Sequence, residues 1–290
     1  MAQGTTPVVQ QRRLRADLRR ARDERGLTQK QVADQAGWSL SKVIRLETGA
    51  TAVSTSDVLA LVQLYGIKNE AQVENMIAVT KAQPEAWWDK YSQQYKQQFI
   101  NFLAFEDGAS VIRQFQAHAV PGLLQARDYA YGVFEAYLVG PGRIDRAWEV
   151  RQRRQQLLER DDVRCDFLLD EAVLHRTVGG PDTMIGQLVK LKELNDRNSP
   201  SLSIRVVPYA AGVTPGMKGS FVVFEYSSED EDFVVNVEEP RSDVLVRDNP
   251  EETSNYVEAF LELEAIALSR ADTNEMLGTV IESLRSSRPS

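Results

Sequence analysis

The chain has 290 residues, of which 42% are hydrophobic and 26% are charged, and its formal net charge is −8. This length and apolar content allow a real hydrophobic core and predict about two domains. Because the sequence has no long apolar run, no charged-then-apolar N-terminus and a single cysteine, Cys165, we expect a cytoplasmic protein without a membrane span, signal peptide or intramolecular disulfide.

The charge is divided unevenly along the chain. Residues 1–50 hold ten basic and five acidic side chains, a net charge of +5, which leaves −13 for the remainder. A basic head followed by an acidic body predicts that nucleic acid binds at the head. It also predicts that the body discourages DNA from adhering elsewhere.

Five helices are predicted within residues 10–82, after a flexible start at residues 1–9. Apolar residues recur in this region at the spacing of amphipathic helices. The predicted helices lie at residues 10–25, at two places within 27–49, and at 54–65 and 70–82.

Residues 27–49, LTQKQVADQAGWSLSKVIRLETG, carry the start and stop signals of two short helices. Thr28 precedes Gln31 by three residues, which is the spacing of a capping box. Gly37 suits the left-handed conformation that ends a helix, and Ser39 suits the cap of the next one. A capped helix, a glycine-containing turn and a second helix predict a helix-turn-helix that binds DNA. An ordinary helical hairpin is the alternative.

The second helix of this pair has one apolar and one polar face. The sets are Leu40, Val43 and Leu46 on the apolar side, and Ser41, Lys42 and Arg45 on the polar side. An exposed polar, basic edge is what a DNA-reading helix needs.

The segment resembles the Xre/Cro/phage-repressor family of helix-turn-helix proteins. The positions that match the family signature are Leu27, Thr28, Gln29, Val32, Ala33, Gly37, Ser39, Ile44, Leu46, Glu47 and Gly49. The resemblance implies an all-α, five-helix Xre-type domain that places the second helix in the major groove of double-stranded DNA.

The same resemblance assigns roles to individual positions. Gln29, helped by Thr28, is expected to bind a phosphate, and Ser39 and Lys42 are expected to touch the DNA backbone. The base-reading positions are Leu40, Ser41 and Arg45, with Arg45 suited to guanine and Leu40 to a thymine methyl group. Arg22 and Glu47 stand where phage repressors form an internal ion pair, so we expect a structural rather than a catalytic pair.

A second domain is predicted beyond a linker at residues 83–90, which begins near Pro84. Residues 91–290 contain strand-like runs, several of which alternate apolar and polar residues as half-buried antiparallel strands do. We therefore expect an α+β domain with a mostly antiparallel sheet. The predicted strands are 110–117, 163–169, 202–207, 220–226 and 233–237, and the predicted helices are 123–137, 143–160, 171–178, 182–197, 251–268 and 272–284.

This second part resembles the C-terminal, antitoxin-like domain of actinobacterial WhiJ-like regulators. The motifs that carry the resemblance include VPGLLQARDYA at 120–130, RQRRQQLL at 151–158 and LLDEAVLHRTVGG at 168–180. The resemblance implies a transcription regulator involved in actinobacterial development that commonly works with a small BldB-like partner protein.

The sequence favours no enzymatic reaction and no metal or other cofactor. The only histidines are His118 and His175, and the segment holding Asp170, Glu171 and His175 lacks the spacing of a metal site. Asp170 is better interpreted as a helix cap. The arginines at 151, 153 and 154 could bind phosphate, but an exposed helix face is favoured. The loop at 212–219, which contains three glycines, either lines a groove for a partner or ligand or is an ordinary hairpin loop.

We therefore expect a non-enzymatic, sequence-specific DNA-binding transcriptional regulator, most simply a repressor. Because one recognition helix reads only a few base pairs, a homodimer on two half-sites is the usual arrangement. The C-terminal domain would then mediate dimerisation and bind the small partner. Two alternatives remain: an antitoxin-like module that restrains a small partner and regulates its own gene, and a metabolite-sensing one-component regulator.

Overall fold

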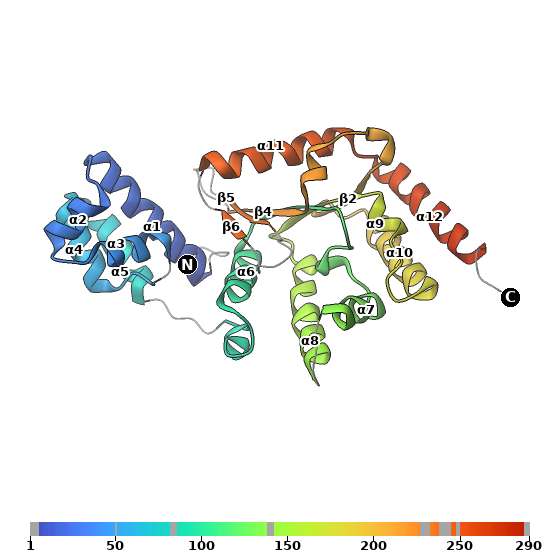
Figure 1. Cartoon of the computed structure of the whole chain (residues 1–290), viewed down its shortest axis with the longest axis horizontal. Helices are drawn as coiled ribbons and strands as arrows, with labels where there is room; N and C mark the ends of the chain where they lie inside the picture. Colours follow the sequence, from blue (N-terminus) through green and yellow to red (C-terminus); the bar gives the residue numbers. More distant parts are fainter. Residues whose placement is uncertain are drawn as a thin grey trace. The chain divides into compact units, whose positions relative to one another are not determined.

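The computed structural model describes residues 6–49, 51–81, 86–137, 142–226, 233–237, 245–247 and 250–286. The chain divides into two compact units, residues 1–93 and 94–290. The first unit is helical, and the second is built on a sheet (Figure 1).

Five helices form the first unit, and each begins or ends close to its predicted position. Their apolar faces meet in one core that includes Leu18, Val32, Val43 and Leu61. The helices are α1 (Pro7–Glu24), α2 (Gln29–Ala36), α3 (Leu40–Thr48), α4 (Thr55–Tyr65) and α5 (Glu70–Lys81).

Helix α1 begins earlier than predicted. The hydroxyl of Thr6 accepts a hydrogen bond from the backbone N–H of Val9, and Pro7 occupies the first helical turn, where its missing N–H costs nothing. Val9 is fully buried. The predicted flexible start at residues 1–9 is therefore wrong for residues 7–9, and residues 1–5 lie outside the described part.

The end of the first unit also differs from the predicted linker at 83–90. Residues 82–85 lie outside the described part of the chain. After them Trp88 is buried, and Tyr91, in the short 3-10 helix η1 (Asp89–Tyr91), is buried too. The ring of Trp87 contacts both rings edge-on. These aromatic residues pack together, and they belong to the first unit, which extends to Gln93.

The second unit contains a six-stranded sheet in the order β3-β2-β1-β4-β5-β6. Strands β1, β2 and β3 run parallel to one another, whereas β4, β5 and β6 pair antiparallel. The strands are β1 (Val111–Gln116), β2 (Arg164–Asp170), β3 (Leu202–Val207), β4 (Phe221–Glu225), β5 (Phe233–Val237) and β6 (Leu245–Arg247).

The sheet is therefore mixed, and the predicted mostly antiparallel sheet is wrong for the half made by β1 to β3. Five consecutive residues of β2, from Cys165 to Leu169, are buried, because helices cover both faces of the sheet there. Such continuous burial is typical of parallel strands, which need crossover connections. The five predicted strands are otherwise confirmed in place, and β6 was not predicted.

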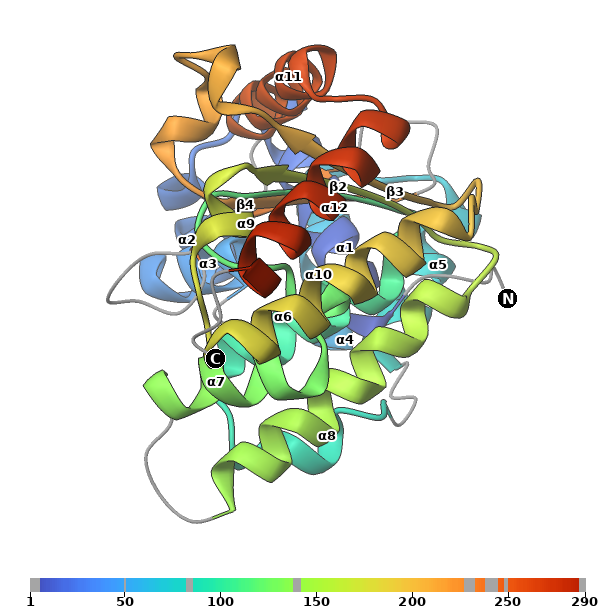
Figure 2. The same cartoon turned by 90° about the vertical axis from the view of Figure 1, so that its right-hand side faces the viewer.

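Seven α-helices of the second unit are described, and they lie on both faces of this sheet. In Figure 1, α11 runs along one face and α6, α7 and α8 lie on the other, while α12 packs against α10 and β3 (Figure 2). The helices are α6 (Gln97–Gly108), α7 (Arg127–Tyr137), α8 (Arg143–Gln155), α9 (Ala172–His175), α10 (Pro181–Asp196), α11 (Pro250–Ile266) and α12 (Arg270–Ser286).

The core under α11 is aromatic and aliphatic. Phe115 of β1 and Phe221 of β4 meet Phe260 and Leu263 of α11 there. Helix α6 was not predicted, although it supplies buried Leu103 and Phe105. Among the described helices, none is both long enough and apolar enough to cross a membrane.

Candidate nucleic-acid interface

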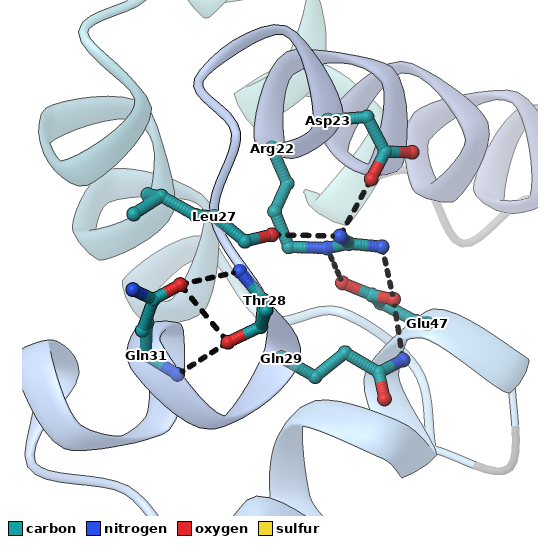
Figure 3. Close-up of polar contacts among 7 residues, drawn as sticks. All are labelled: Arg22, Asp23, Leu27, Thr28, Gln29, Gln31 and Glu47. Carbon is teal, nitrogen blue, oxygen red and sulfur yellow. Dashed lines mark hydrogen bonds and ion pairs between the residues drawn. The ribbon is translucent and has the colours of Figure 1, made fainter.

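Helix α2 starts on a complete capping box. The backbone N–H of Gln31 donates to the hydroxyl of Thr28 at 3.3 Å, and the Thr28 N–H donates to Oε1 of Gln31 at 2.8 Å (Figure 3). The helix ends at Gly37, whose φ of 67° lies in the left-handed region that glycine adopts at low cost. The two signals that predicted this helix from sequence therefore define its ends.

Helix α3 is fixed in the same way. The hydroxyl of Ser39 accepts a hydrogen bond from the backbone N–H of Lys42 at 3.2 Å, and Gly49 ends the helix at a φ of 76°. Val43 and Leu46 are buried in the core of the unit. Because the inner face is anchored, the outer face of α3 is held in one rotational setting.

Four side chains make up the outer face of α3, which we call the reading face: Leu40, Ser41, Ile44 and Arg45. All four are exposed, Leu40 by 43% and Ile44 by 39%. A helix that enters the major groove contacts base edges with residues of its N-terminal part. The reading face includes the first two residues of α3, and all four members lie within its first six.

An ion pair joins α1 to α3 behind this face. Nε of Arg22 lies 2.7 Å from Oε1 of Glu47, and the Arg22 guanidinium donates a second hydrogen bond to Oε2 at 3.1 Å (Figure 3). The same guanidinium donates to the backbone carbonyl of Leu27 and to Asp23. The two side chains are only 13% and 10% exposed, so the pair acts in a partly dehydrated setting.

Two electrostatic effects oppose each other at Arg22. Burial alone would lower the pKa of its guanidinium, but the hydrogen bond and charge of Glu47 outweigh burial and raise the pKa. The guanidinium therefore stays charged. The structure brings together the two residues that the sequence analysis paired, and their bidentate geometry fixes the last turn of α3 against α1.

Gln29 has a partner within the first unit. Its Nε2 donates to Oε2 of Glu47 at 2.8 Å (Figure 3), so the amide joins the Arg22–Glu47 network. The expected contact of Gln29 with a phosphate stays a prediction. The side chain links the start of α2 to the end of α3. In this structure, Gln29 therefore helps to hold α2 and α3 in place relative to each other.

Lys42 is also committed to a partner within the unit. Its Nζ lies 2.7 Å from Oδ1 of Asp57 and 3.7 Å from the centroid of the Trp38 ring. The expected contact of Lys42 with the DNA backbone stays a prediction. Sequence reasoning did not single out Asp57 or Trp38, although the Ser54-x-x-Asp57 capping box was a readable signal.

The environment of Asp57 stabilises its charged form. Burial alone would raise the pKa of this carboxyl group, but the hydrogen bonds from Lys42 and Ser54 outweigh it and lower the pKa. The hydroxyl of Ser54 donates at 2.6 Å and its backbone N–H at 3.1 Å. Lys42 thereby ties the first turn of α3 to the first turn of α4.

The residues weighed for catalysis in the second unit lie in ordinary structural surroundings. Cys165 is buried, and burial raises the pKa of its thiol. Oδ1 of Asp170 accepts the backbone N–H of Ala172, the first residue of α9, at 2.9 Å, although the N-cap position itself is Glu171. Nε2 of His175 lies 3.4 Å from Oε1 of Glu171, and the imidazole ring stacks on the ring of Tyr209. Within the described ranges, no three acidic, histidine or cysteine side chains cluster in a way that would hold a metal ion.

The arginines of α8 are not all exposed. Arg154 donates two hydrogen bonds of 2.7 Å to Glu106 of α6, and both side chains are nearly buried. The predicted exposed face is therefore wrong at Arg154. The reason is that its partner belongs to the helix that the sequence pattern did not show.

The loop with several glycines borders a groove on the second unit. A space of about 550 Å³ lies beside α11, with Pro215, Lys218 and Gly219 of the loop on one side and Tyr256 and Ala259 of α11 on the other. The loop therefore forms a wall of this groove. The alternative of an ordinary hairpin is wrong, because the loop connects β3 to β4 and these strands are separated in the sheet by β2 and β1.

Two parts of the chain match known families. Residues 13–76 match a family described as a helix-turn-helix domain. Residues 99–279, which are more than half of the chain, match a family described as a domain of unknown function (DUF5753). No curated protein and no solved structure matches the chain. The first match confirms the helix-turn-helix predicted at residues 27–49.

Proposed function

The chain belongs to the family defined by the domain of unknown function DUF5753 and carries a helix-turn-helix domain, and from this we propose a sequence-specific transcriptional regulator. The observation that carries the proposal is the reading face of α3. Its four side chains are exposed, while the opposite side of the helix is fixed by the core and by the Arg22–Glu47 pair.

In the proposed complex, α3 lies in the major groove of double-stranded DNA. Arg45 binds guanine through its two parallel N–H donors, Leu40 packs on a thymine methyl group and Ser41 contacts a base edge. Thr28 and Ser39 lie at helix N-termini, where backbone N–H groups favour phosphate oxygens. These roles follow the resemblance to Xre-type proteins, and the exposure of the reading face supports them.

A homodimer that acts as a repressor is the simplest arrangement. A single α3 offers four reading side chains, which is too few for useful specificity, and two half-sites solve this problem. The second unit is the natural place for dimer contacts and for a small BldB-like partner, because the reading face must stay free. The resemblance to WhiJ-like regulators supports the partner, and leaves an antitoxin-like role for the second unit open.

The groove beside α11 favours one second candidate, a metabolite-sensing regulator. Its volume of about 550 Å³ falls within the range of roughly 300–1,000 Å³ that small-molecule sites occupy. Thermal melts of the full chain with a metabolite library separate this candidate from the first. A compound that stabilises the second unit and changes DNA affinity would support it.

The proposed function is tested by selecting binding sites from random DNA with the full chain, and then measuring Arg45→Ala. We expect a recurrent motif, and a loss of about 1–3 kcal/mol on that motif with little loss on unrelated DNA. Lys68→Ala is the matched control, because Lys68 is an exposed cation of the same unit outside α3. Absence of any recurrent motif would contradict the proposal.

A further inference from the structure

The reading face has an apolar edge that needs an explanation. Leu40 and Ile44 lie four residues apart on α3, and such residues are neighbours on one line of a helix. The other aliphatic side chains of this helix, Val43 and Leu46, are buried in the core. Leu40 and Ile44 instead face solvent side by side, which is unfavourable unless something covers them.

Two polar side chains of α2 and α3, Gln29 and Lys42, already have partners within the first unit. The amide of Gln29 donates to Glu47, and the ammonium group of Lys42 is held between Asp57 and the Trp38 ring. Ser41 and Arg45 remain as the polar members of the reading face. The surface that α3 offers to a base pair is therefore half aliphatic.

In the major groove, one group distinguishes bases by apolar contact, the C5 methyl group of thymine. Resting on the proposed function, we propose that Leu40 and Ile44 form an apolar reading pair that binds the methyl groups of two thymines. Ile44 thereby becomes a specificity-determining residue beside Arg45. Four residues advance a helix by about 6 Å, and base pairs rise by about 3.4 Å, so the two thymines lie within about two base pairs of each other.

Deoxyuridine provides the direct test, because it lacks only the methyl group of thymine. Motifs selected with the full chain are synthesised with single thymines replaced by deoxyuridine, and affinities are measured by fluorescence anisotropy. We expect two thymines of the half-site to lose roughly fourfold in affinity each, the value for one buried methyl group. Replacing thymines outside the half-site is the control and should change nothing.

The contacts are assigned by combining DNA and protein changes. With Ile44→Ala, one of the two sensitive thymines should become insensitive to loss of its methyl group, and with Leu40→Ala the other should. Such non-additivity is the signature of a direct contact. Leu59→Ala is the matched control, because Leu59 is an aliphatic residue on α4 that is at least as exposed as Leu40 and Ile44, and it should leave both sensitivities unchanged.

Failure of this proposal is distinguishable from failure of the proposed function. A recurrent motif without thymines in its half-site, or one whose affinity ignores deoxyuridine, would overturn the apolar reading pair and leave DNA recognition intact. Loss of self-association in Leu40→Ala and Ile44→Ala, measured by sedimentation, with unchanged thymine sensitivity, would show that a second copy covers this edge. Absence of any motif would overturn both proposals.

Discussion

The pair formed by Arg22 and Glu47 shows how one contact orients a recognition helix. Its hydrogen bonds reach from α1 to the last turn of α3, and Gln29 adds a third connection from α2. Because the carboxylate accepts hydrogen bonds from both neighbouring helices, its loss removes one acceptor from the Arg22 guanidinium and one from the Gln29 amide in a partly buried region. Such uncompensated groups cost more than the net value of the pair itself.

We predict that Glu47→Ala destabilises the first unit by less than the roughly 3–5 kcal/mol that breaking a fully buried pair costs, because the two side chains remain 13% and 10% exposed. Chemical denaturation followed by the fluorescence of Trp38, which packs against this core, would measure it. Glu24→Ala is the control, since Glu24 is an exposed carboxylate at the end of α1 and its loss should change stability little. An unchanged transition in Glu47→Ala would contradict a structural role for the pair.

The lowered pKa of Asp57 makes the stability of the first unit depend on acid. The folded-state pKa lies below the ordinary value of 3.8, so the charged form stabilises the fold. This contribution is fully present above the unfolded-state pKa and is lost as the pH falls through the folded-state pKa. Between neutral pH and about pH 5 it should stay constant.

We therefore predict that Asp57→Asn lowers stability at neutral pH and flattens its decline below about pH 4. Urea titrations between pH 2.5 and 7 would show this, with Asp34→Asn, an exposed carboxylate of α2, as the control. A decline of the same steepness in Asp57→Asn and the unchanged protein would show that other carboxylates control acid unfolding.

At the scale of elements, local signals predicted most of the architecture. Thr28, Gly37 and Ser39 mark helix ends through contacts within four residues, so a sequence pattern contains all the information. The five predicted strands could likewise be located from the pattern of residues within each strand. The parallel pairing of β1 and β2 was not, because it depends on Val111 meeting Arg164 across an intervening helical crossover.

The contacts that Lys42 and Gln29 make within the first unit were not predicted for the same reason, because they join residues far apart in the sequence. The partners of Lys42 and Gln29 lie 15 and 18 positions along the chain, on different helices. A resemblance places each residue on a helix, yet it does not say whether a long side chain extends to DNA or folds back to a neighbour. Leu40 is a similar case: its helical spacing with Val43 and Leu46 placed it on the apolar side of the helix, but the structure leaves it 43% exposed.

The contact of α6 with α8 offers a test at this scale. Arg154 and Glu106 form two hydrogen bonds, and the Arg154 guanidinium also lies 4.9 Å from the Phe102 ring. We predict a coupling energy of at least about 1.5 kcal/mol between Arg154→Ala and Glu106→Ala in a double-mutant cycle of thermal unfolding. Arg146→Ala, an exposed arginine of α8, should show no coupling with Glu106→Ala. Additive effects of the first two changes would show that α6 and α8 stabilise the unit independently.

At the scale of the whole molecule, the division of charge assigns DNA affinity to the first unit. Residues 1–50 carry +5, and the remainder of the chain carries −13. Phosphate contacts release counterions, so the logarithm of affinity falls against the logarithm of salt concentration with a slope of about −0.9 per contact. An acidic second unit should add nothing to this slope, and in the proposed dimer it would set the distance between two reading faces.

These two roles predict how the full chain responds to salt and to site spacing. DNA with two half-sites should give roughly twice the salt slope of DNA with one half-site, because two first units then contact phosphates instead of one. Moving the half-sites apart by half a helical turn, about five base pairs, should weaken binding sharply, since the second α3 then faces the wrong side of the duplex. Both quantities come from one anisotropy series over salt and spacing. Equal slopes on one and two half-sites, together with indifference to spacing, would show that each chain reads DNA alone and that the second unit serves a purpose other than pairing.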